Sequence, residues 1–323
     1  MAKLNTLKES STHRIIVYGA PKTGKSELVG KLAEFYDLIW VDLENGHSVL
    51  HKLPETWKQR IEIVNIRDTK SYPIAAETCL KMVKGPVSIC EVHSKVGCMI
   101  CTREEVKVCK DAPKEEHGDI HASFFIDLDI PEMGPEKIVV FDSLTQLSNS
   151  IISHITKKQP DDYKLNYDDW GNLAKLLDVF LSEIQQAGYN VIVISHEQEI
   201  EGENKKKSLT PVGGTRNYSR NVAKFFDHVV YCERKNKKHV FASSTTYATN
   251  ILTGSRSDVK IEDGGDDASL LAIFKPELYA QRIAASSGAP SVTATKTGSS
   301  VSKSPVKAST AAILAKLKNQ KKK

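Results

Sequence analysis

The sequence predicts an α/β fold in which helices cover both faces of a mostly parallel sheet. Short, wholly apolar segments rich in β-branched residues alternate with segments of helical spacing, and this alternation is typical of parallel sheets buried on both sides. The composition, 40% hydrophobic and 26% charged over 323 residues, is that of a globular protein. It excludes a collagen, a coiled coil and a wholly disordered chain, and no apolar run is long enough to predict a transmembrane helix.

The expected elements follow from apolar runs and the residues that interrupt them. Strands are expected at residues 14–18, 38–43, 61–66, 137–141, 191–195 and 225–232, with a last pair near 238–241 and 247–252. Helices are expected at residues 27–36, 72–83 and 168–188. The last of these has apolar residues at helical spacing and ends at Gly188.

The chain is expected to divide into a lead-in (residues 1–13), a core (14–282) with an insertion (84–133), and a tail (283–323). The lead-in is polar and lacks the apolar stretch of a secretory signal. The insertion breaks the strand and helix pattern with cysteines, histidines and charges. The tail begins with a Ser/Thr/Ala/Gly-rich flexible linker, and residues 310–317 could form a short helix.

Charge is unevenly distributed along the chain. The net charge is +5, and residues 283–323 contain eight lysines, no arginine and no acid. Subtracting these eight charges leaves about −3 for residues 1–282. The overall basic character therefore does not predict a nucleic-acid partner, and such a partner must be argued from local patches.

Residues 19–26, GAPKTGKS, match the phosphate-binding pattern G-x-x-x-x-G-K-[ST] between a predicted strand and a predicted helix. Glycines let backbone amides approach phosphate oxygens, and the start of the helix adds its dipole. Lys25 is expected to reach the β- and γ-phosphates of ATP, and Ser26 to coordinate Mg²⁺. The predicted nucleotide-binding residues are Gly19, Ala20, Pro21, Lys22, Thr23, Gly24, Lys25 and Ser26.

Polar residues follow three other predicted strands, and parallel strands bring such ends to one edge of a sheet. Asp142 closes KIVVFD and is expected to hold Mg²⁺ together with Ser26. Glu44 comes directly after the strand predicted at residues 38–43, in the sequence WVDLENG. It is expected to orient or deprotonate the attacking water, with Asp42 as its competitor. Ser195 and His196, at the end of the strand VIVIS, stand where a side chain can sense the γ-phosphate, and His196 is the candidate for this role.

The order of these motifs resembles the RecA-like branch of P-loop ATPases over about residues 14–260. After the phosphate loop come VDLENG, IVVFDSLTQL, VIVISHEQ and PVGGTRNYSRNVAKFFDHVVYCER. The pattern is most similar to the compact AAA-type nucleotide-binding proteins of bacteriophages, the single-strand-annealing recombinase type. The resemblance implies a RecA-like P-loop NTPase core in a homo-oligomeric ring or filament. It also implies that Glu44 is the catalytic glutamate and that His196 stands where RecA has a glutamine.

The resemblance further implies a basic residue that completes the site from a neighbouring subunit, and mobile loops that bind single-stranded DNA. Arg256 is the first candidate for this finger, and Arg234 with Lys235 is the alternative. The loops expected to bind DNA are residues 148–169 and 199–217. The basic candidates in the second loop are Lys205, Lys206, Lys207 and Arg216, which suit contacts to phosphates.

Two chelating pairs lie in the insertion. Four residues separate the pair Cys90 and His93 from the pair Cys98 and Cys101, and this spacing predicts a structural zinc site with three thiolates and one imidazole. The reserve ligands are Cys109, His117 and His121. Zinc is expected to act as a staple for a segment too small to build its own core, and a contact with nucleic acid or a neighbouring subunit is a further option.

These features predict an ATP-dependent recombination or annealing ATPase that binds single-stranded DNA. The alternatives are a nucleotide-controlled regulatory switch that acts through protein contacts, and a helicase-type motor core. The basic tail is expected to tether DNA, to bind a partner such as a single-strand-binding or replication protein, or only to keep the chain soluble. The expected location is the cytoplasm, that of the host if the protein is phage-encoded, with no membrane contact.

Overall fold

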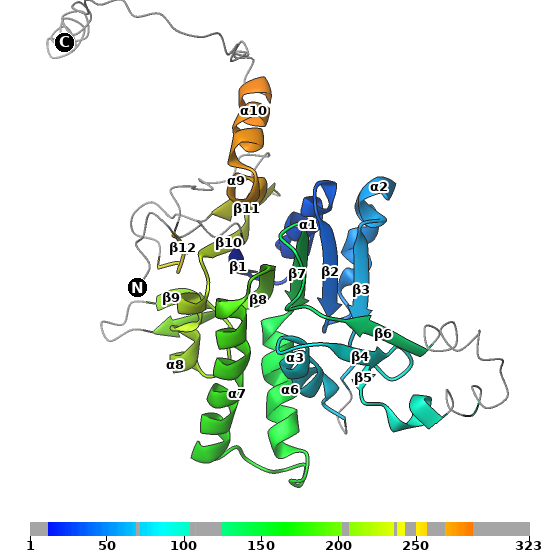
Figure 1. Cartoon of the computed structure of the whole chain (residues 1–323). Coiled ribbons are helices and arrows are strands. Elements are labelled where there is room, and N and C mark those ends of the chain that lie inside the picture. Colours follow the sequence, from blue (N-terminus) through cyan, green and yellow to red (C-terminus); the bar gives the residue numbers. More distant parts are fainter. Residues whose placement is uncertain are drawn as a thin grey trace, which may run out of the picture. The chain divides into compact units, whose positions relative to one another are not determined.

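The computed structural model describes residues 12–68, 72–103, 107, 124–201, 207–235, 238–242, 250–256 and 269–286 (Figure 1). The chain divides into two units, Met1–Ile283 and Ala284–Lys323. Several sequence predictions fall outside the described residues, namely the lead-in up to residue 11, the reserve zinc ligands, Lys205 and Lys206, the first half of the strand at 247–252, and the tail beyond residue 286. In the described part of the chain, no helix has the length and apolar character needed to cross a bilayer.

A mostly parallel sheet forms the centre of the first unit, and its main path runs β11-β10-β1-β8-β7-β2-β3. Its strands are β1 Arg14–Gly19, β2 Asp37–Asp42, β3 Ile61–Asn65, β7 Lys137–Asp142, β8 Asn190–Glu201, β10 His228–Lys235 and β11 Lys238–Ala242. Neighbours from β10 to β3 are all parallel, and β11 is antiparallel. Two short strands add antiparallel pairs, β9 (Lys207–Pro211) with β8 and β12 (Gly254–Ser255) with β10. The predicted α/β fold is confirmed.

Helices cover both faces of this sheet because side chains alternate along each strand. In β1, Ile16 and Tyr18 join one apolar cluster, whereas Ile15 and Val17 join the other. The helices of the first cluster are α3 Ile74–Met82, α6 Leu144–Thr156 and α7 Tyr167–Gln186. The second cluster draws on α1 Lys25–Gly30, η2 Lys31–Glu34 and α9 Leu271–Phe274. The remaining helices are η3 His47–Lys52, α2 Glu55–Lys58, α8 Arg216–Ser219, η5 Val222–Phe225 and α10 Pro276–Ser286.

Helix α6 corrects the loop expected at residues 148–169. That prediction is wrong over residues 148–156, which continue the helix, and a connection remains only at residues 157–166. Ser143 caps α6 by accepting a hydrogen bond from the Gln146 amide. Three buried residues at helical spacing hold the helix against the sheet, namely Leu144, Leu147 and Ile151.

Strand β8 corrects the second expected loop, residues 199–217. The strand runs past the predicted end at residue 195 to Glu201 and turns back as β9, so the two form an antiparallel ribbon. The Tyr18 hydroxyl, from β1, donates to the carbonyl oxygens of Leu209 and Leu252 and secures the base of the ribbon. The polar sequence hid this ribbon because both of its strands leave the apolar core.

The insertion forms a small sheet of its own. Strands β4 (Val87–Cys90), β5 (Lys95–Val96) and β6 (Phe125–Leu128) pair antiparallel in the order β5-β4-β6, separately from the central sheet. Residues 99–103 add a helical turn. We call these strands, with residues 91–103, the cysteine module. Its own buried cluster is small and consists of Cys90, Cys98, Cys101 and Phe125. Other residues of its strands, Val87, Ile89 and Leu128, pack into the main apolar cluster.

Gly19 should not tolerate a side chain. An added Cβ would lie 2.0 Å from the Cys232 carbonyl oxygen, a backbone atom of β10, and the Gly19 φ is +154°. Gly19→Ala is therefore expected to lower the free energy of unfolding by roughly 1–3 kcal/mol, measured by urea denaturation. Gly188→Ala is the matched control, because an added Cβ there meets nothing within 4 Å. Equal stability of the two variants would contradict this assignment.

Candidate active site and metal cluster

The loop between β1 and α1 closes around the side chain of Lys25. The Lys25 Nζ donates to the carbonyl oxygens of Gly19 (2.9 Å) and Ala20 (2.8 Å), and the Thr23 hydroxyl also donates to Ala20 (2.8 Å). Gly24 reaches the left-handed region at φ 91°, which lets the chain turn directly into α1. The loop thus holds a cationic side chain beneath its own backbone.

Burial lowers the pKa of Lys25 from its ordinary value, although neighbouring carboxylates partly offset the effect. The side chain is only 7% exposed. The ammonium group therefore lacks a full hydration shell, and an anionic ligand in the loop would supply the stabilisation that water supplies elsewhere.

Asp142 and Ser26 place two oxygen donors side by side. Asp142 ends β7, is 4% exposed, and accepts a hydrogen bond from the Ser26 hydroxyl at 3.0 Å. Burial, followed by the charge of Glu44, raises the pKa of Asp142 to about 7. A buried carboxylate next to a hydroxyl fits a hard divalent cation such as Mg²⁺, and such an ion would offset the unfavourable charge.

Glu44 lies next to Asp142, where it contacts Ser143 and His196. It accepts a hydrogen bond from the Ser143 hydroxyl, and the His196 Nε2 lies 3.3 Å from its Oε1. Burial raises the pKa of Glu44, but the hydrogen bonds from His196 and Ser143 outweigh burial and leave the pKa below its ordinary value. Glu44 is therefore an ionised carboxylate at neutral pH, as a general base must be.

Asp42, the competing candidate, is fully engaged by its own turn. It is completely buried, and its Oδ1 accepts from the amides of Glu44 and Gly46, both at 3.1 Å. Its Oδ2 contacts the His47 Nδ1 at 2.6 Å. Since both oxygens are used, Asp42 shapes the turn that presents Glu44, and the geometry favours Glu44 over Asp42 as the reactive group.

His196 is held in place by Thr145, which the sequence analysis did not single out, and by its predicted companion Ser195. The Thr145 hydroxyl accepts from the His196 amide at 3.0 Å, and the Ser195 hydroxyl donates to the His196 and Val212 carbonyl oxygens at 3.0 and 2.9 Å. Ser143 was likewise missed. The available signal for Ser143 and Thr145 was position, because both follow Asp142 in FDSLT.

These groups line a single cleft of about 390 Å³ at the carboxyl ends of the parallel strands. Its lining includes Pro21, Lys22, Gly24, Lys25, Ser26, Glu44, Asp142, Ser143, Ser195 and His196. The structure therefore brings together Lys25, Ser26, Glu44, Asp142 and His196, although four separate segments of the chain supply them.

A family model described as an AAA domain matches residues 11–257, more than half of the chain. The chain belongs to this AAA domain family. Together with the phosphate loop and the parallel sheet, membership makes the protein a P-loop NTPase. Among curated proteins, none matches the sequence of this AAA domain protein.

Among solved structures, the AAA domain protein is similar to a prototypical ATPase from the type III secretion system of pathogenic bacteria. The two sequences are 15% identical, and the TM-score is 0.35. The match covers 69% of this chain and 52% of the other, so it spans about half of that structure's length.

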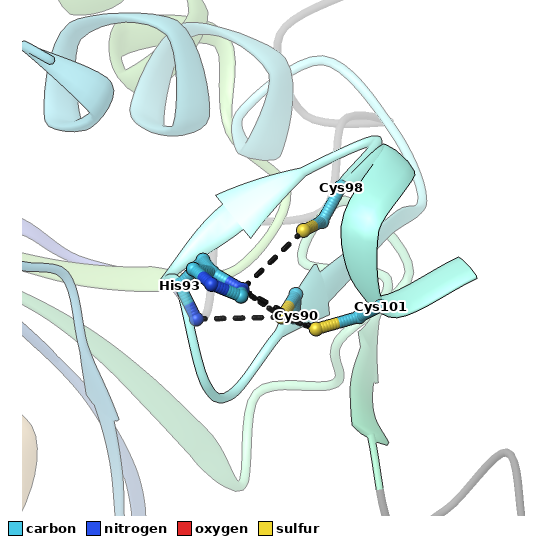
Figure 2. Close-up of side chains that lie close together, drawn as sticks. All are labelled: Cys90, His93, Cys98 and Cys101. Atoms are coloured by element: carbon cyan, nitrogen blue, oxygen red, sulfur yellow. Dashed lines mark hydrogen bonds between the residues drawn. The ribbon is translucent and has the colours of Figure 1, made fainter. Parts of the chain in front are cut away.

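The cysteine module of the AAA domain protein brings its four predicted ligands together (Figure 2). The four donor atoms all lie within 4.8 Å of one another. The His93 Nδ1 is 3.3 Å from the Cys101 Sγ and 3.5 Å from those of Cys90 and Cys98. The three cysteines are buried and the histidine is exposed. Three soft thiols and one imidazole that face a common centre fit Zn²⁺ better than a hard cation.

The described DNA and finger candidates do not line this cleft. Lys207, on β9, pairs with Glu199 at 2.7 Å, and Arg216 is exposed at the start of α8. Arg256 donates to Asp227 at 3.3 Å, next to the amino end of β10 and therefore at the end of the sheet opposite the phosphate loop. Arg234 is exposed in the carboxyl half of β10, at the same end as the phosphate loop. The side chain of its companion Lys235 lies outside the described part.

Asp142→Asn is expected to stabilise the protein without nucleotide or magnesium. Because the pKa of Asp142 lies above the ordinary value of 3.8, the folded state binds the proton more tightly, and stability is lost as pH rises from about 4 to about 7. The variant should therefore melt several degrees higher than the wild type at pH 8, and the difference should shrink towards pH 4. Thermal unfolding in EDTA across this range measures both effects, and a difference independent of pH would contradict the assignment.

Proposed function

We propose that this protein is a magnesium-dependent ATPase that binds single-stranded DNA and acts in recombination or annealing. The observation that carries the proposal is the convergence of Lys25, Ser26, Asp142, Glu44 and His196 on one cleft. A phosphate loop, an oxygen pair for a cation and an ionised carboxylate are the parts that hydrolysis of a nucleoside triphosphate requires.

Each group has a distinct task in this proposal. Lys25 and the loop amides bind the phosphates, and Ser26 with Asp142 would hold Mg²⁺, which when bound neutralises charge on the β- and γ-phosphates. Glu44 orients the attacking water and accepts its proton. His196, whose Nε2 contacts Glu44 in this structure, can hydrogen-bond a γ-phosphate oxygen instead, so the same imidazole distinguishes an empty site from a filled one.

The path of β8 supports a link between nucleotide and DNA. His196 lies in the middle of this strand, and residues 197–201 continue it directly into the β8–β9 ribbon. The basic residues Lys207 and Arg216 lie at and just after this ribbon. A shift of His196 on nucleotide binding is therefore passed to the ribbon without an intervening loop. The proposal includes a homo-oligomeric ring or filament in the cytoplasm, in which Arg256 or Arg234 completes a neighbour's site.

Zinc is the proposed ligand of the cysteine module, in a structural role. The four donors converge, whereas the module's buried cluster consists of only four residues. An ion that cross-links β4 to residues 98–101 would fix the ligand-bearing part of the module, where the buried cluster is small.

The ATPase activity should rise when single-stranded DNA is added. Initial rates of phosphate release, measured with and without an oligothymidine, test this expectation, because ribbon contacts would bias His196 and Glu44 towards the reactive arrangement. An unchanged rate with no salt-dependent DNA binding would favour a regulatory switch that acts through protein contacts. Stimulation with processive strand separation would favour a helicase-type motor.

Two variants separate binding from turnover in the same assay. Glu44→Gln should retain ATP binding and lose about a hundredfold or more of the turnover rate, whereas Lys25→Ala should lose binding. Glu55→Gln, on the exposed helix α2, is the matched control and should behave as the wild type. If Glu44→Gln and Lys25→Ala lose binding equally, Glu44 does not have the role proposed for it.

The purified protein should contain about one zinc ion per chain by elemental analysis. Cys101→Ser should lose the ion, and hydrogen exchange should then accelerate in β4 and β5 because the cross-link is gone. Cys79→Ala is the matched control, since Cys79 is a buried cysteine of α3 outside the cluster, and it should retain zinc. Wild-type protein without zinc and with freely titrating module thiols would contradict the proposal.

A further inference from the structure

A long groove lies beside the cysteine module, apart from the nucleotide cleft. It consists of two adjoining cavities, of about 500 Å³ against the module and about 380 Å³ against α3 and the end of α6. The two cavities adjoin, since Tyr72, Ile74 and Lys95 line both, and we call the pair the module groove. Among the described residues, the lining of this groove and that of the nucleotide cleft have no member in common.

Basic side chains dominate the charged part of the module groove. They come from three separate segments of the chain and are Arg67, Lys95, Lys157 and Lys158, with His93 and His154 as further nitrogen donors. The acid in the described lining is Glu77, and its Oε1 accepts a hydrogen bond from Lys81 at 2.7 Å. That bond and the nearby charges of Lys95 and His154 lower the pKa of Glu77. The groove is therefore electropositive, and its one acid already has a basic partner.

Large apolar side chains are exposed at the same place. Tyr72 is 69% exposed, Val92 66%, Met99 65% and Ile100 60%. These four make up half of the large exposed hydrophobic residues in the described part of the chain. All four line the cavity against the module. A local concentration of exposed apolar side chains marks a contact surface, and here the basic groups lie along the same groove.

We propose that the module groove binds a segment of single-stranded DNA, with phosphates on the basic side chains and bases against Tyr72, Met99 and Ile100. The inference rests on the proposed DNA-dependent function and adds a surface distinct from the β8–β9 ribbon. Charge complementarity points to a polyanion. The apolar contacts point to a polyanion whose flat faces are accessible, which holds for unpaired bases and not for a duplex.

The groove also gives the cysteine module a task beyond its own folding. Val92, Met99 and Ile100 lie between or next to the proposed zinc ligands in sequence. The cross-link that holds those ligands would also fix the apolar wall of the groove. Loss of the ion should therefore weaken DNA binding and leave the nucleotide cleft intact.

Fluorescence anisotropy with a labelled oligothymidine and full-length protein tests the proposal. Lys157→Glu with Lys158→Glu should weaken binding by tenfold or more and reduce its salt dependence, and Tyr72→Ala should weaken it by about tenfold. Lys52→Glu with Lys175→Glu is the matched control, because it changes the net charge equally at exposed residues outside the groove. The control should bind DNA as the wild type does, and all variants should keep the ATPase rate measured without DNA.

The outcomes distinguish this inference from the function on which it rests. Wild-type protein that binds no single-stranded DNA would overturn both. If the groove variants bind single-stranded DNA as tightly as the wild type does, the proposal for the groove is wrong, and the β8–β9 ribbon remains the proposed DNA-binding surface. The proposal would also be overturned if the groove and control variants lost DNA affinity equally, or if the groove variants lost affinity equally for duplex and single-stranded DNA. Either result would indicate general charge attraction. Protein that binds an acidic peptide in place of DNA would identify a different partner and count against the proposal.

Discussion

The in-register carboxyl ends of four parallel strands are the constraint on which the site depends. Asp42 pairs with Asp142 across β2 and β7, and Gly19 pairs with His196 across β1 and β8. These pairings set the cleft residues at one edge before any side-chain contact forms. A register slip of a single residue would turn the side chains of a strand to the opposite face, so the apolar alternation that builds the core also aligns the reactive groups.

Charge balance is the second determinant of the cleft. Glu44 and Asp142 are both acidic and close, and their pKa values move apart, downward for Glu44 and upward for Asp142. Glu44 receives hydrogen bonds from His196 and Ser143, whereas Asp142 is buried and accepts a hydrogen bond from the Ser26 hydroxyl. When the surroundings move the pKa values of two carboxylates apart in this way, the two groups suit different chemical roles. One suits proton transfer, and the other suits a metal ion.

The sequence predicted the central sheet well because parallel strands buried on both faces are continuous apolar runs. It also predicted the set of residues that meet in the cleft, since phosphate-loop and strand-end signals are local. It failed where local polarity concealed structure. Helix α6 and the β8–β9 ribbon are both absent from the prediction, and the ribbon depends on contacts such as that of Tyr18 with Leu209 and Leu252, which are far apart in sequence. Thr145 was missed because a hydroxyl that accepts a hydrogen bond from a backbone amide has no recognisable sequence motif.

The turn after β2 has no spare acceptor on Asp42, whose two oxygens are occupied by the backbone and side chain of the following residues. The backbone position of Glu44 is therefore set when the chain folds and does not depend on a ligand. The conformational entropy of the turn that carries this carboxylate is lost once, when the protein folds, and not again in each catalytic cycle. A preorganised base of this kind leaves substrate binding energy available for moving other parts of the molecule.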